Sequence, residues 1–161
     1  MESAKSNRRR QSKRRFSVRT SSIHGNGVFA TVSIGDGELI CEYKGQLVSW
    51  EVAMNGPPRN LAQPDHTFYF DIGNGYVIDG SIGGNSARWI NHSCAPNCEP
   101  ELDAGRIFIR ASRQINAGEE LSIDYALSGE EKVSKALRKR YACYCGASDC
   151  RGTMIAGRKS R

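Results

Sequence analysis

Short apolar runs, separated by glycine, asparagine and aspartate, recur along the chain from residue 16 onward. Runs rich in Val, Ile, Phe and Tyr that are bounded by turn residues are typical of β-strands. Asn74-Gly75 joins two of these runs and favours a tight hairpin turn. The pattern therefore predicts a mainly β domain, with strands over residues 27–34, 38–43, 67–72, 75–79, 106–111 and 120–125.

Helical patterns are few. Ser128, followed three residues later by Glu131, resembles a capping box, and a helix is predicted from there to about residue 140. The last turn of this helix, residues 138–140, is basic, which suits the negative end of the helix dipole. A shorter helix is predicted over residues 85–90, and the stretch 56–64, which contains glycine and proline, is predicted to be a loop.

The composition limits the class of protein. A chain of 161 residues with 39% hydrophobic and 25% charged residues is typical of one globular domain with its own core. No apolar run approaches the roughly 20 residues that span a bilayer. The N-terminus also lacks the apolar stretch of a secretory signal. We therefore expect an intracellular protein that is not in a membrane: cytoplasmic, or nuclear and chromatin-associated if it is eukaryotic or delivered to a host.

The net charge of +6 is concentrated at the ends of the chain. Residues 1–15 hold seven basic side chains and one acidic side chain, whereas residues 16–157 hold 13 basic and 16 acidic ones. A mildly acidic body suits a basic peptide or protein as a partner. The arm 1–15 is interpreted either as a solvated, disordered tail or as a segment that contacts nucleic acid.

The six cysteines suggest a metal site. Cys143, Cys145 and Cys150 form a C-x-C-x4-C pattern, and Gly146 permits a tight turn between them. Structural zinc takes four thiolates, so a fourth ligand must come from Cys94 or Cys98, and spacing alone leaves both open. A framework of three disulfides is the alternative, but it would require an oxidising compartment. Cys41 lies in an apolar strand pattern and is predicted to be a buried thiol.

Residues 25–30 formally fit the dinucleotide-binding pattern G-x-G-x-x-A. That pattern must follow a strand and open a helix, whereas here it continues into an apolar stretch of strand composition. The pattern therefore does not favour a Rossmann site. The glycines still allow a different cofactor to approach the backbone closely.

Four segments, in this order along the chain, resemble the SET-domain lysine methyltransferases. The most specific are the N-H-S-C block at residues 91–94 and the E-L-x-x-D-Y block at residues 120–125. The C-x-C-x4-C pattern resembles the post-SET segment of the same family. The resemblance covers residues 16–154, and its four segments are residues 23–30, 42–45, 85–98 and 118–125.

The resemblance implies a mainly β SET-domain fold with short α-helices, made of several small β-sheets, a pseudoknot and a zinc-bound cap at the C-terminal end. In the pseudoknot, one segment threads through a loop formed by another. Together with the charge and helix patterns, it divides the chain into five parts. They are a basic disordered arm (1–15), a SET domain (16–127), a linking helix (128–141), a post-SET zinc cap (142–154) and a basic tail (155–161).

The resemblance also implies roles for individual residues. Tyr125 would be the main catalytic residue, with Tyr43 beside it, and Asn91 and His92 would hydrogen-bond S-adenosylmethionine. The contacts to this cofactor would come from His24, Gly25, Asn26, Gly27, Val28, Phe68, Arg88, Asn91, His92, Tyr125, Tyr144 and Met154. The lysine channel would be lined by Tyr43, Phe68, Ile123 and Tyr125. The structural zinc ion would be bound by Cys94, Cys143, Cys145 and Cys150.

The reaction implied is the transfer of a methyl group from S-adenosylmethionine to a neutral lysine amine, on a histone or another basic protein that is associated with nucleic acid. Many family members carry Phe or Tyr two residues before the catalytic tyrosine. This chain has Ile123, which predicts room for di- or trimethylation. Peptide choice would depend on residues 51–65 and the C-terminal tail. The alternatives are a SET-like binding module without turnover and a small zinc-stabilised nucleic-acid-binding protein.

Overall fold

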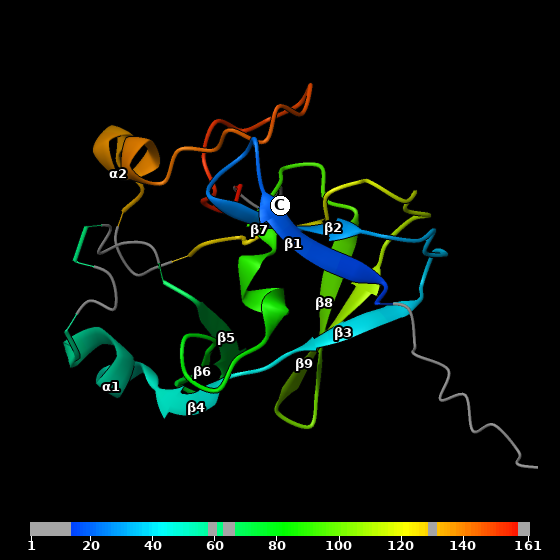
Figure 1. Ribbon diagram of the computed structural model, residues 1–161. Helices are drawn as coiled ribbons and strands as arrows, with labels where there is room; N and C mark the ends of the chain where they lie inside the picture. The colour runs from blue at the N-terminus through cyan, green and yellow to red at the C-terminus, as the bar shows by residue number, and fades with distance from the viewer. Residues whose placement is uncertain (1–13, 58–60, 63–66, 129–131, 158–161) are drawn as a thin grey trace, which may run out of the picture.

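The computed structural model describes residues 14–57, 61–62, 67–128 and 132–157. Within these residues the chain forms ten short strands, two α-helices and one 3-10 helix (Figure 1). In chain order they are β1 (Phe16–Thr20), β2 (Asn26–Ala30), β3 (Leu39–Tyr43), β4 (Gln46–Ser49), α1 (Trp50–Asn55), β5 (Tyr69–Gly73), β6 (Tyr76–Asp79), η1 (Ser86–Trp89), β7 (Asn91–His92), β8 (Cys98–Asp103), β9 (Arg106–Ala111), β10 (Ser122–Ile123) and α2 (Lys135–Arg140). The predicted mainly β class is confirmed.

The strands form four small sheets, in the orders β1-β2, β10-β7, β3-β9-β8 and β4-β6-β5. The pairs within three of these sheets are antiparallel, whereas β10 and β7 run parallel. In the parallel pair Ser122 lies opposite Asn91 and Ile123 lies opposite His92. This pairing brings the two most specific sequence blocks side by side. Threading of one segment through the other remains an expectation.

All six predicted strands are present, with shifted ends. β9 occupies the predicted residues 106–111, whereas β10 covers only two of the predicted residues 120–125. Strands β1, β4, β7 and β8 and helix α1 are not indicated by the sequence pattern. In β8 the reason is clear, because Pro100 and three acidic residues interrupt its apolar alternation and its residues after Cys98 are exposed. It is an edge strand, where proline is tolerated.

The helix predicted to begin at Ser128 begins later. The structure places its N-cap at Ser134, whose side chain accepts a hydrogen bond from the Leu137 N–H at 3.1 Å. Ser128 lies outside the helix, so the predicted start is wrong, and Glu131 of the predicted capping box lies outside the described residues. The short helix predicted over residues 85–90 is confirmed as η1, which is capped by Asn85. No helix among the described residues is long and apolar enough to cross a bilayer.

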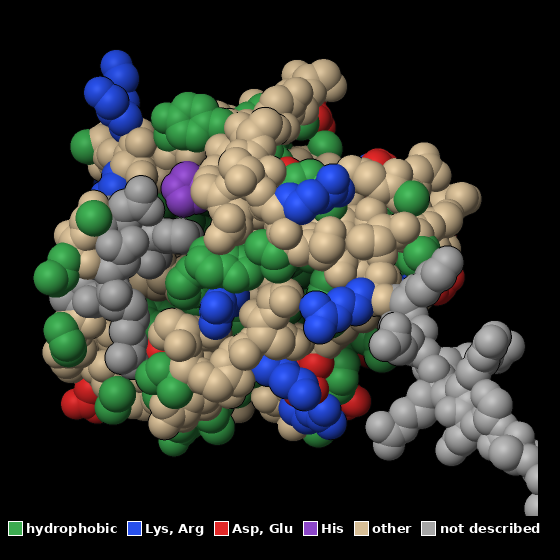
Figure 2. Space-filling view, viewed as in Figure 1, with side chains coloured by type: hydrophobic (Ala, Val, Ile, Leu, Met, Phe, Trp, Pro, Cys, Tyr) green, Lys and Arg blue, Asp and Glu red, His purple; other side chains and the backbone are tan. Residues whose placement is uncertain are grey.

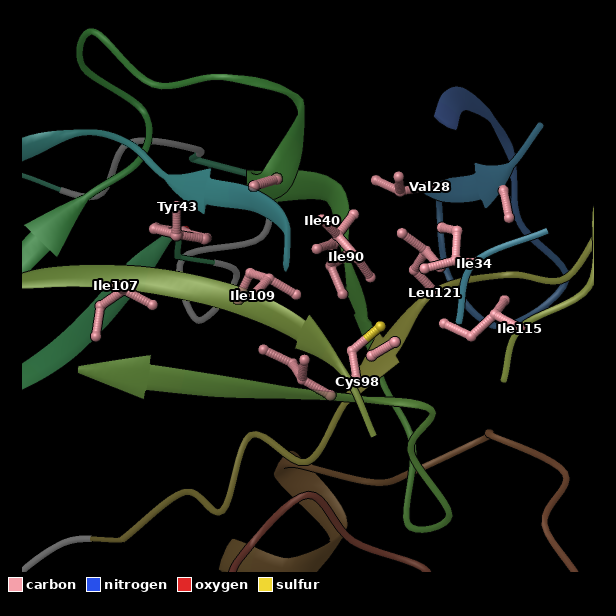
Figure 3. Close-up of a cluster of buried hydrophobic side chains, with 14 of the residues drawn as sticks. Val28, Ile34, Ile40, Tyr43, Ile90, Cys98, Ile107, Ile109, Ile115 and Leu121 are labelled. Carbon is pink, nitrogen blue, oxygen red and sulfur yellow. The ribbon is translucent and has the colours of Figure 1, made fainter. Parts of the chain in front are cut away.

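The hydrophobic core lies where β2, β3, β9, η1 and β10 meet (Figure 3). Ile34, Ile109, Ile115 and Leu121 are fully buried in it. Burial of a side chain of this size contributes about 1.5–3 kcal/mol. All members of this core cluster, and the side chains packed on it, come from residues 16–123. The core therefore fixes the segments that carry the site, and the C-terminal cap lies outside it.

Candidate functional site

Asn91 holds the glycine-containing segment 24–28 in place. Its side chain is buried, and Nδ2 donates hydrogen bonds to the carbonyl oxygens of His24 (3.1 Å) and Asn26 (2.9 Å). The same amide lies 2.9 Å from Glu120 Oε1, and Glu120 Oε2 accepts from the Ser21 hydroxyl at 2.9 Å. These contacts connect β7 to the loop before β2. The exposed residues His24, Gly25 and Asn26, which are predicted to contact the cofactor, therefore lie beside Asn91.

Gly27 and Val28 are buried where this segment enters β2. A Cβ atom at residue 27 would lie 2.2 Å from Glu120 Oε1 and 3.0 Å from the Ser21 Cβ. The absence of a side chain at Gly27 therefore allows Glu120 to approach and pair with Asn91. The glycine pattern serves close packing beside the site, and a helix does not follow it.

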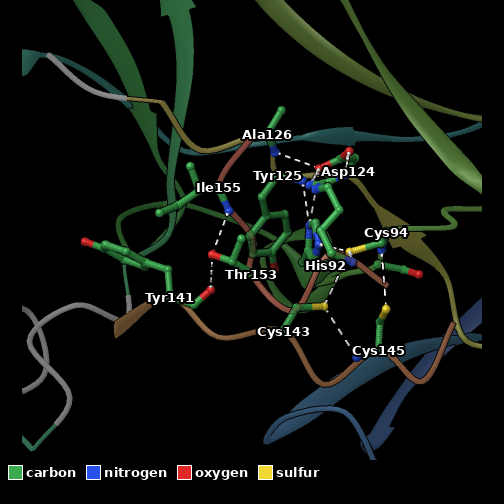
Figure 4. Close-up of polar contacts among 12 residues, drawn as sticks. His92, Cys94, Asp124, Tyr125, Ala126, Tyr141, Cys143, Cys145, Thr153 and Ile155 are labelled. Carbon is green, nitrogen blue, oxygen red and sulfur yellow. Dashed lines mark hydrogen bonds and ion pairs between the residues drawn. The ribbon is translucent and has the colours of Figure 1, made fainter. Parts of the chain in front are cut away.

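His92 and Tyr125 form the centre of the site. His92 is buried, and its Nδ1 accepts a hydrogen bond from the backbone N–H of Tyr125 at 2.9 Å. The imidazole is therefore assigned as the tautomer that carries its proton on Nε2. Desolvation by burial lowers the pKa of His92, which favours this neutral form. The His92 and Tyr125 rings lie edge to face, with centroids 5.4 Å apart (Figure 4).

The hydroxyl of Tyr125 points back into the domain and donates to the carbonyl oxygen of Ile90 at 2.5 Å. The pKa of this phenol is raised, chiefly by burial and secondarily by the charge of Glu120. Tyr125 nevertheless keeps 37% of its surface exposed, so one side of the residue is open to a ligand. The phenol is therefore a neutral group that can contact a bound molecule.

Aromatic side chains surround Tyr43. Its hydroxyl donates to the carbonyl oxygen of Phe68 at 2.7 Å, and its ring centroid lies 5.1 Å from that of Phe70. Phe68 in turn packs edge to face on Trp89, at 5.1 Å. Burial, followed by the nearby Tyr125, raises the pKa of Tyr43. The structure thus brings together Tyr43 and Phe68, two residues of the predicted lysine channel. Sequence reasoning missed Phe70 and Trp89, whose signal is an aromatic residue within the predicted strand 67–72 and within the predicted helix 85–90.

Arg88 lies beside this aromatic group, with its guanidinium carbon 5.1 Å from the Trp89 ring centroid. Its Nε is buried and has no hydrogen-bond partner among the described residues, a property shared by Arg151 Nε. A buried N–H without an acceptor is costly. Arg88 therefore fits a position where a cofactor supplies an acceptor.

Of the remaining predicted site residues, one lies in the hydrophobic core and two lie in the cap. The side chain of Ile123 is 3% exposed and belongs to the core cluster. Met154 is half-buried in the cap, and its carbonyl oxygen accepts from the Leu127 N–H at 3.1 Å. Tyr144 is 73% exposed on the cap, so its predicted contact with the cofactor does not involve the core of the domain.

The Sγ atoms of Cys94, Cys143, Cys145 and Cys150 all lie within 4.8 Å of one another, and all six cysteines are free thiols. Figure 4 shows Cys94, Cys143 and Cys145 of this cluster. Cys94 Sγ lies 3.8 Å from Cys143 Sγ and 3.8 Å from Cys150 Sγ. A tetrahedron with zinc–sulfur bonds of about 2.3 Å has edges of about 3.8 Å, so the four thiols fit structural zinc.

Cys98, the other candidate for the fourth ligand, is 1% exposed in the hydrophobic core. Burial raises its pKa to about 11. Cys41 is half-buried and packs against the same core, and burial raises its pKa to about 12. Both thiols are therefore held in the neutral form and lie outside the four-cysteine cluster.

Backbone amides surround the sulfurs of the cluster. The N–H of Arg151 donates to Cys94 Sγ at 3.4 Å, and the N–H of Gly152 donates to Cys150 Sγ at 3.3 Å. Burial opposes the ionisation of Cys145, but hydrogen bonds from the Cys94 and Ala147 amides, with the neighbouring thiols, lower its pKa to about 6. Four thiolates this close together require a cation, which is the role of structural zinc.

Residues 25–126 match the family model described as SET domain, so the chain belongs to the SET-domain family. It is 37% identical over 138 residues to histone-lysine N-methyltransferase 2D of Homo sapiens, covering 83% of this chain and 2% of that protein. It is 38% identical over 148 residues to histone-lysine N-methyltransferase TRX1 of Oryza sativa subsp. japonica, covering 88% of this chain and 14% of that protein.

The fold is similar to the solved structure of "ctPRC2 in an autoinhibited conformation bound to S-adenosylmethionine". The TM-score is 0.62 with 30% sequence identity, and the match covers 68% of this chain and 15% of that chain. This chain therefore spans only a small part of the length of these relatives.

Proposed function

We propose that this chain is an S-adenosylmethionine-dependent protein-lysine N-methyltransferase. Three observations support the proposal: the chain belongs to the SET-domain family, its relatives are named histone-lysine methyltransferases, and a structure with the same fold binds S-adenosylmethionine. The observation that carries it is the parallel pairing of β7 with β10. That pairing places Asn91 and His92 directly beside the strand that leads into Tyr125.

The proposed cofactor site lies between the SET domain (residues 16–127), called the body from here on, and the cap (residues 142–154). The backbone of residues 24–28, the side chains of Asn91 and His92 and the buried Nε of Arg88 would hold S-adenosylmethionine, which supplies a methyl group on a positively charged sulfur. Tyr144 and Met154 would cover it from the cap. Because the Asn91 Nδ2 already pairs with protein oxygens, Asn91 would also shape the adjacent backbone.

The substrate lysine would enter beside Tyr43 and Tyr125. A lysine with a pKa near 10.4 is almost wholly protonated at neutral pH, and withdrawal into an aromatic channel disfavours the ammonium form. The raised pKa values of both phenols keep them protonated at neutral pH, so neither is available as a base to take the proton of the ammonium. Tyr125 would therefore orient the neutral amine, and placement would contribute more than proton abstraction.

Incubation of the chain with labelled S-adenosylmethionine and histones tests the proposal. We expect label on lysine, and Tyr125→Phe should lower turnover by about 100-fold, as expected for a misplaced reacting group. Tyr76→Phe, which removes an exposed phenol of β6, is the matched control and should keep wild-type turnover. Cofactor binding without transfer to any protein would instead indicate a silent binding module.

A histone is the substrate that we favour, because the body of the chain is mildly acidic and the relatives carry histone in their names. Such a substrate would place the protein at chromatin. Residues 51–65 are proposed to contribute to peptide choice. Val52, Ala53, Gly56 and Pro57 of this region line a hollow of about 220 Å³, together with Val48, Tyr69 and Asp79.

The product is proposed to reach the di- or trimethylated state, because Ile123 is smaller than an aromatic residue and has no hydroxyl. Mass spectrometry of histone after exhaustive reaction tests this. Wild type should give di- or trimethyl-lysine, and Ile123→Phe should shift the product towards monomethyl-lysine. Only monomethyl product from the wild type would refute it. Ile123→Leu keeps the aliphatic volume and should keep the wild-type product.

Nucleic-acid contact through the arm 1–15 remains a prediction, because the arm lies mostly outside the described residues. On the face seen in Figure 2, the described basic side chains are scattered and form no continuous basic patch. We therefore expect deletion of residues 1–15 to remove most salt-dependent binding to DNA. Binding that persists in the truncated chain would favour the nucleic-acid-binding alternative.

A further inference from the structure

Arg151 links the cap to the body of the domain. It follows Cys150 in the chain, and its Nη1 and Nη2 donate to Asp124 Oδ2 (2.8 Å) and Oδ1 (2.9 Å). The two side chains are 26% and 33% exposed, so solvent screens this pair only partly. A forked guanidinium–carboxylate pair restricts the direction as well as the distance of its partner. The position of Asp124 therefore depends on the closed cap.

The same residue contacts the cysteine cluster, because its backbone N–H donates to Cys94 Sγ at 3.4 Å. Four thiolates and one Zn²⁺ have a net negative charge, and a neighbouring guanidinium offsets part of it. Arg151 thus contacts the metal-binding group through its backbone and the body through its side chain.

Asp124 lies at the turn that carries Tyr125. Its Oδ1 accepts the N–H of Ala126 at 2.9 Å and lies 3.5 Å from His92 Nδ1, the atom that accepts the N–H of Tyr125. Ala126 has a φ of 46°, in the left-handed region that residues with a Cβ rarely adopt. Such a turn persists only when its surroundings hold it. Asp124, which directly follows β10, supplies that support through its contact with the Ala126 N–H.

We propose that Arg151 is a positioning residue that couples closure of the metal-bound cap to the placement of Tyr125. The proposal rests on the proposed methyltransferase function and assigns to that site a connection between cap and reacting group. With the cap closed, Arg151 fixes Asp124, and Asp124 fixes the turn that orients Tyr125. With the cap open, the turn at Ala126 loses this support and the phenol leaves its position.

Arg151→Gln, Asp124→Asn and the double variant, all loaded with zinc, test the proposal. We expect each single variant to lower kcat by about 10- to 100-fold, with KM for a histone peptide changed less than about threefold. The double variant should have a kcat no lower than that of the slower single variant, because the two substitutions remove the same Arg151–Asp124 pair. Arg151→Lys should restore part of kcat, because lysine keeps the charge but lacks the fork.

The matched control is Arg110→Gln, which removes another arginine–carboxylate pair, with Glu101 on the β8-β9 sheet, and should keep wild-type kcat. Zinc content is measured in every variant. If Arg151→Gln loses zinc, Asp124→Asn decides the question, because it leaves the cap sequence intact. Full zinc content with unchanged kcat in Asp124→Asn would overturn the proposal.

A readout independent of activity separates this proposal from the proposed function. The NMR shifts of the Tyr125 amide and His92 Nδ1 should move in Arg151→Gln and Asp124→Asn without cofactor or peptide, but stay unchanged in Arg110→Gln. Wild-type protein that transfers no methyl group, with these shifts still responding, would refute the proposed function and support the positioning role. Shifts that do not respond would refute the positioning role.

Discussion

Tyr43 and Tyr125 are both anchored by backbone carbonyl oxygens, those of Phe68 and Ile90. A neutral acceptor suits a neutral phenol, and burial raises the pKa of both residues. Both tyrosines therefore remain protonated over the pH range in which a lysine becomes increasingly neutral. We expect the rate of methyl transfer to rise with pH according to the ionisation of the lysine.

The raised pKa of Tyr43 predicts a pH dependence of stability. Below the ordinary tyrosine pKa of 10.0, the phenol is neutral in both the folded and unfolded chain, and its hydrogen bond to Phe68 contributes about 1 kcal/mol. Above pH 10 the Tyr43 phenol ionises in the unfolded chain but stays neutral in the folded chain. Its contribution to the unfolding free energy is therefore lost as pH rises. The difference in unfolding free energy between wild type and Tyr43→Phe should therefore narrow by up to about 1.4 kcal/mol per pH unit.

Denaturant unfolding between pH 8 and pH 11 measures this difference. Tyr76→Phe, at an exposed site, provides the control and should follow the wild-type curve. A difference between wild type and Tyr43→Phe that stays constant above pH 10 would contradict a buried, neutral phenol.

Individual residues also show where spacing along the chain is insufficient. The C-x-C-x4-C pattern indicates a thiolate site but leaves Cys94 and Cys98 as equal candidates. Cys98 begins β8 opposite Ala111, so its side chain enters the core, whereas Cys94 lies in the turn after β7. Which of the two cysteines joins the cluster depends on the register of β8 against β9. The spacing of the cysteines along the chain does not reveal that register.

Among the elements, predictability follows the strength of the local pattern. β3, β6 and β9 are short apolar strands bounded by turn residues, and the sequence indicates them well. α2 has no buried residue, so an apolar face does not fix where it begins. β7 and β10 have only two residues each and pair in parallel across some 30 residues of chain. No periodicity can develop in two residues, so the sequence pattern does not predict this pairing.

The junction between β2, β7 and the segment before β10 depends on the absence of a side chain at Gly27. We expect Gly27→Ala to displace the Glu120 carboxylate from Asn91 and Ser21 and to lower the unfolding free energy by about 1–3 kcal/mol. Binding of S-adenosylmethionine should weaken as well, because residues 24–28 lose their support. Thermal unfolding and titration calorimetry measure the two effects.

The steric cause can be tested in a second background. In Glu120→Ala protein the obstructing carboxylate is absent. Adding Gly27→Ala should therefore lower the unfolding free energy less than it does in the wild type. Equal costs in both backgrounds would show that the alanine acts through something other than Glu120.

At the scale of the whole molecule, the core and the metal-binding cap are separate. The core cluster and the side chains packed on it come from residues 16–123, while three of the four clustered cysteines come from residues 143–150. The contacts between the two include the Arg151–Asp124 pair and the backbone hydrogen bonds of Leu127 with Met154 and Ala156. Loss of metal should therefore open the cap without unfolding the sheets.

Removal of zinc by a chelator, or Cys145→Ser, should leave the far-UV circular dichroism of the β-sheets nearly unchanged. Affinity for S-adenosylmethionine should fall by about tenfold or more, because the metal folds the segment that covers the cofactor. Cys98→Ala is the matched control: it should keep its zinc and lose stability instead, since its thiol lies in the core. Full cofactor affinity in zinc-free protein would contradict this coupling.

The chain distance between Cys94 and Cys143, 49 positions, affects the order of assembly. In an unfolded polypeptide, bringing together ends that far apart carries a loop-closure penalty of about 3 kcal/mol. Once β7 and β10 have paired, Cys94 and Ile123 are held in place, and only the stretch from Ile123 to Cys143 still has to close. Zinc binding should thus be the last step of folding. When zinc is scarce, the protein would be inactive with its β-sheets still folded, and renewed zinc binding would restore its activity.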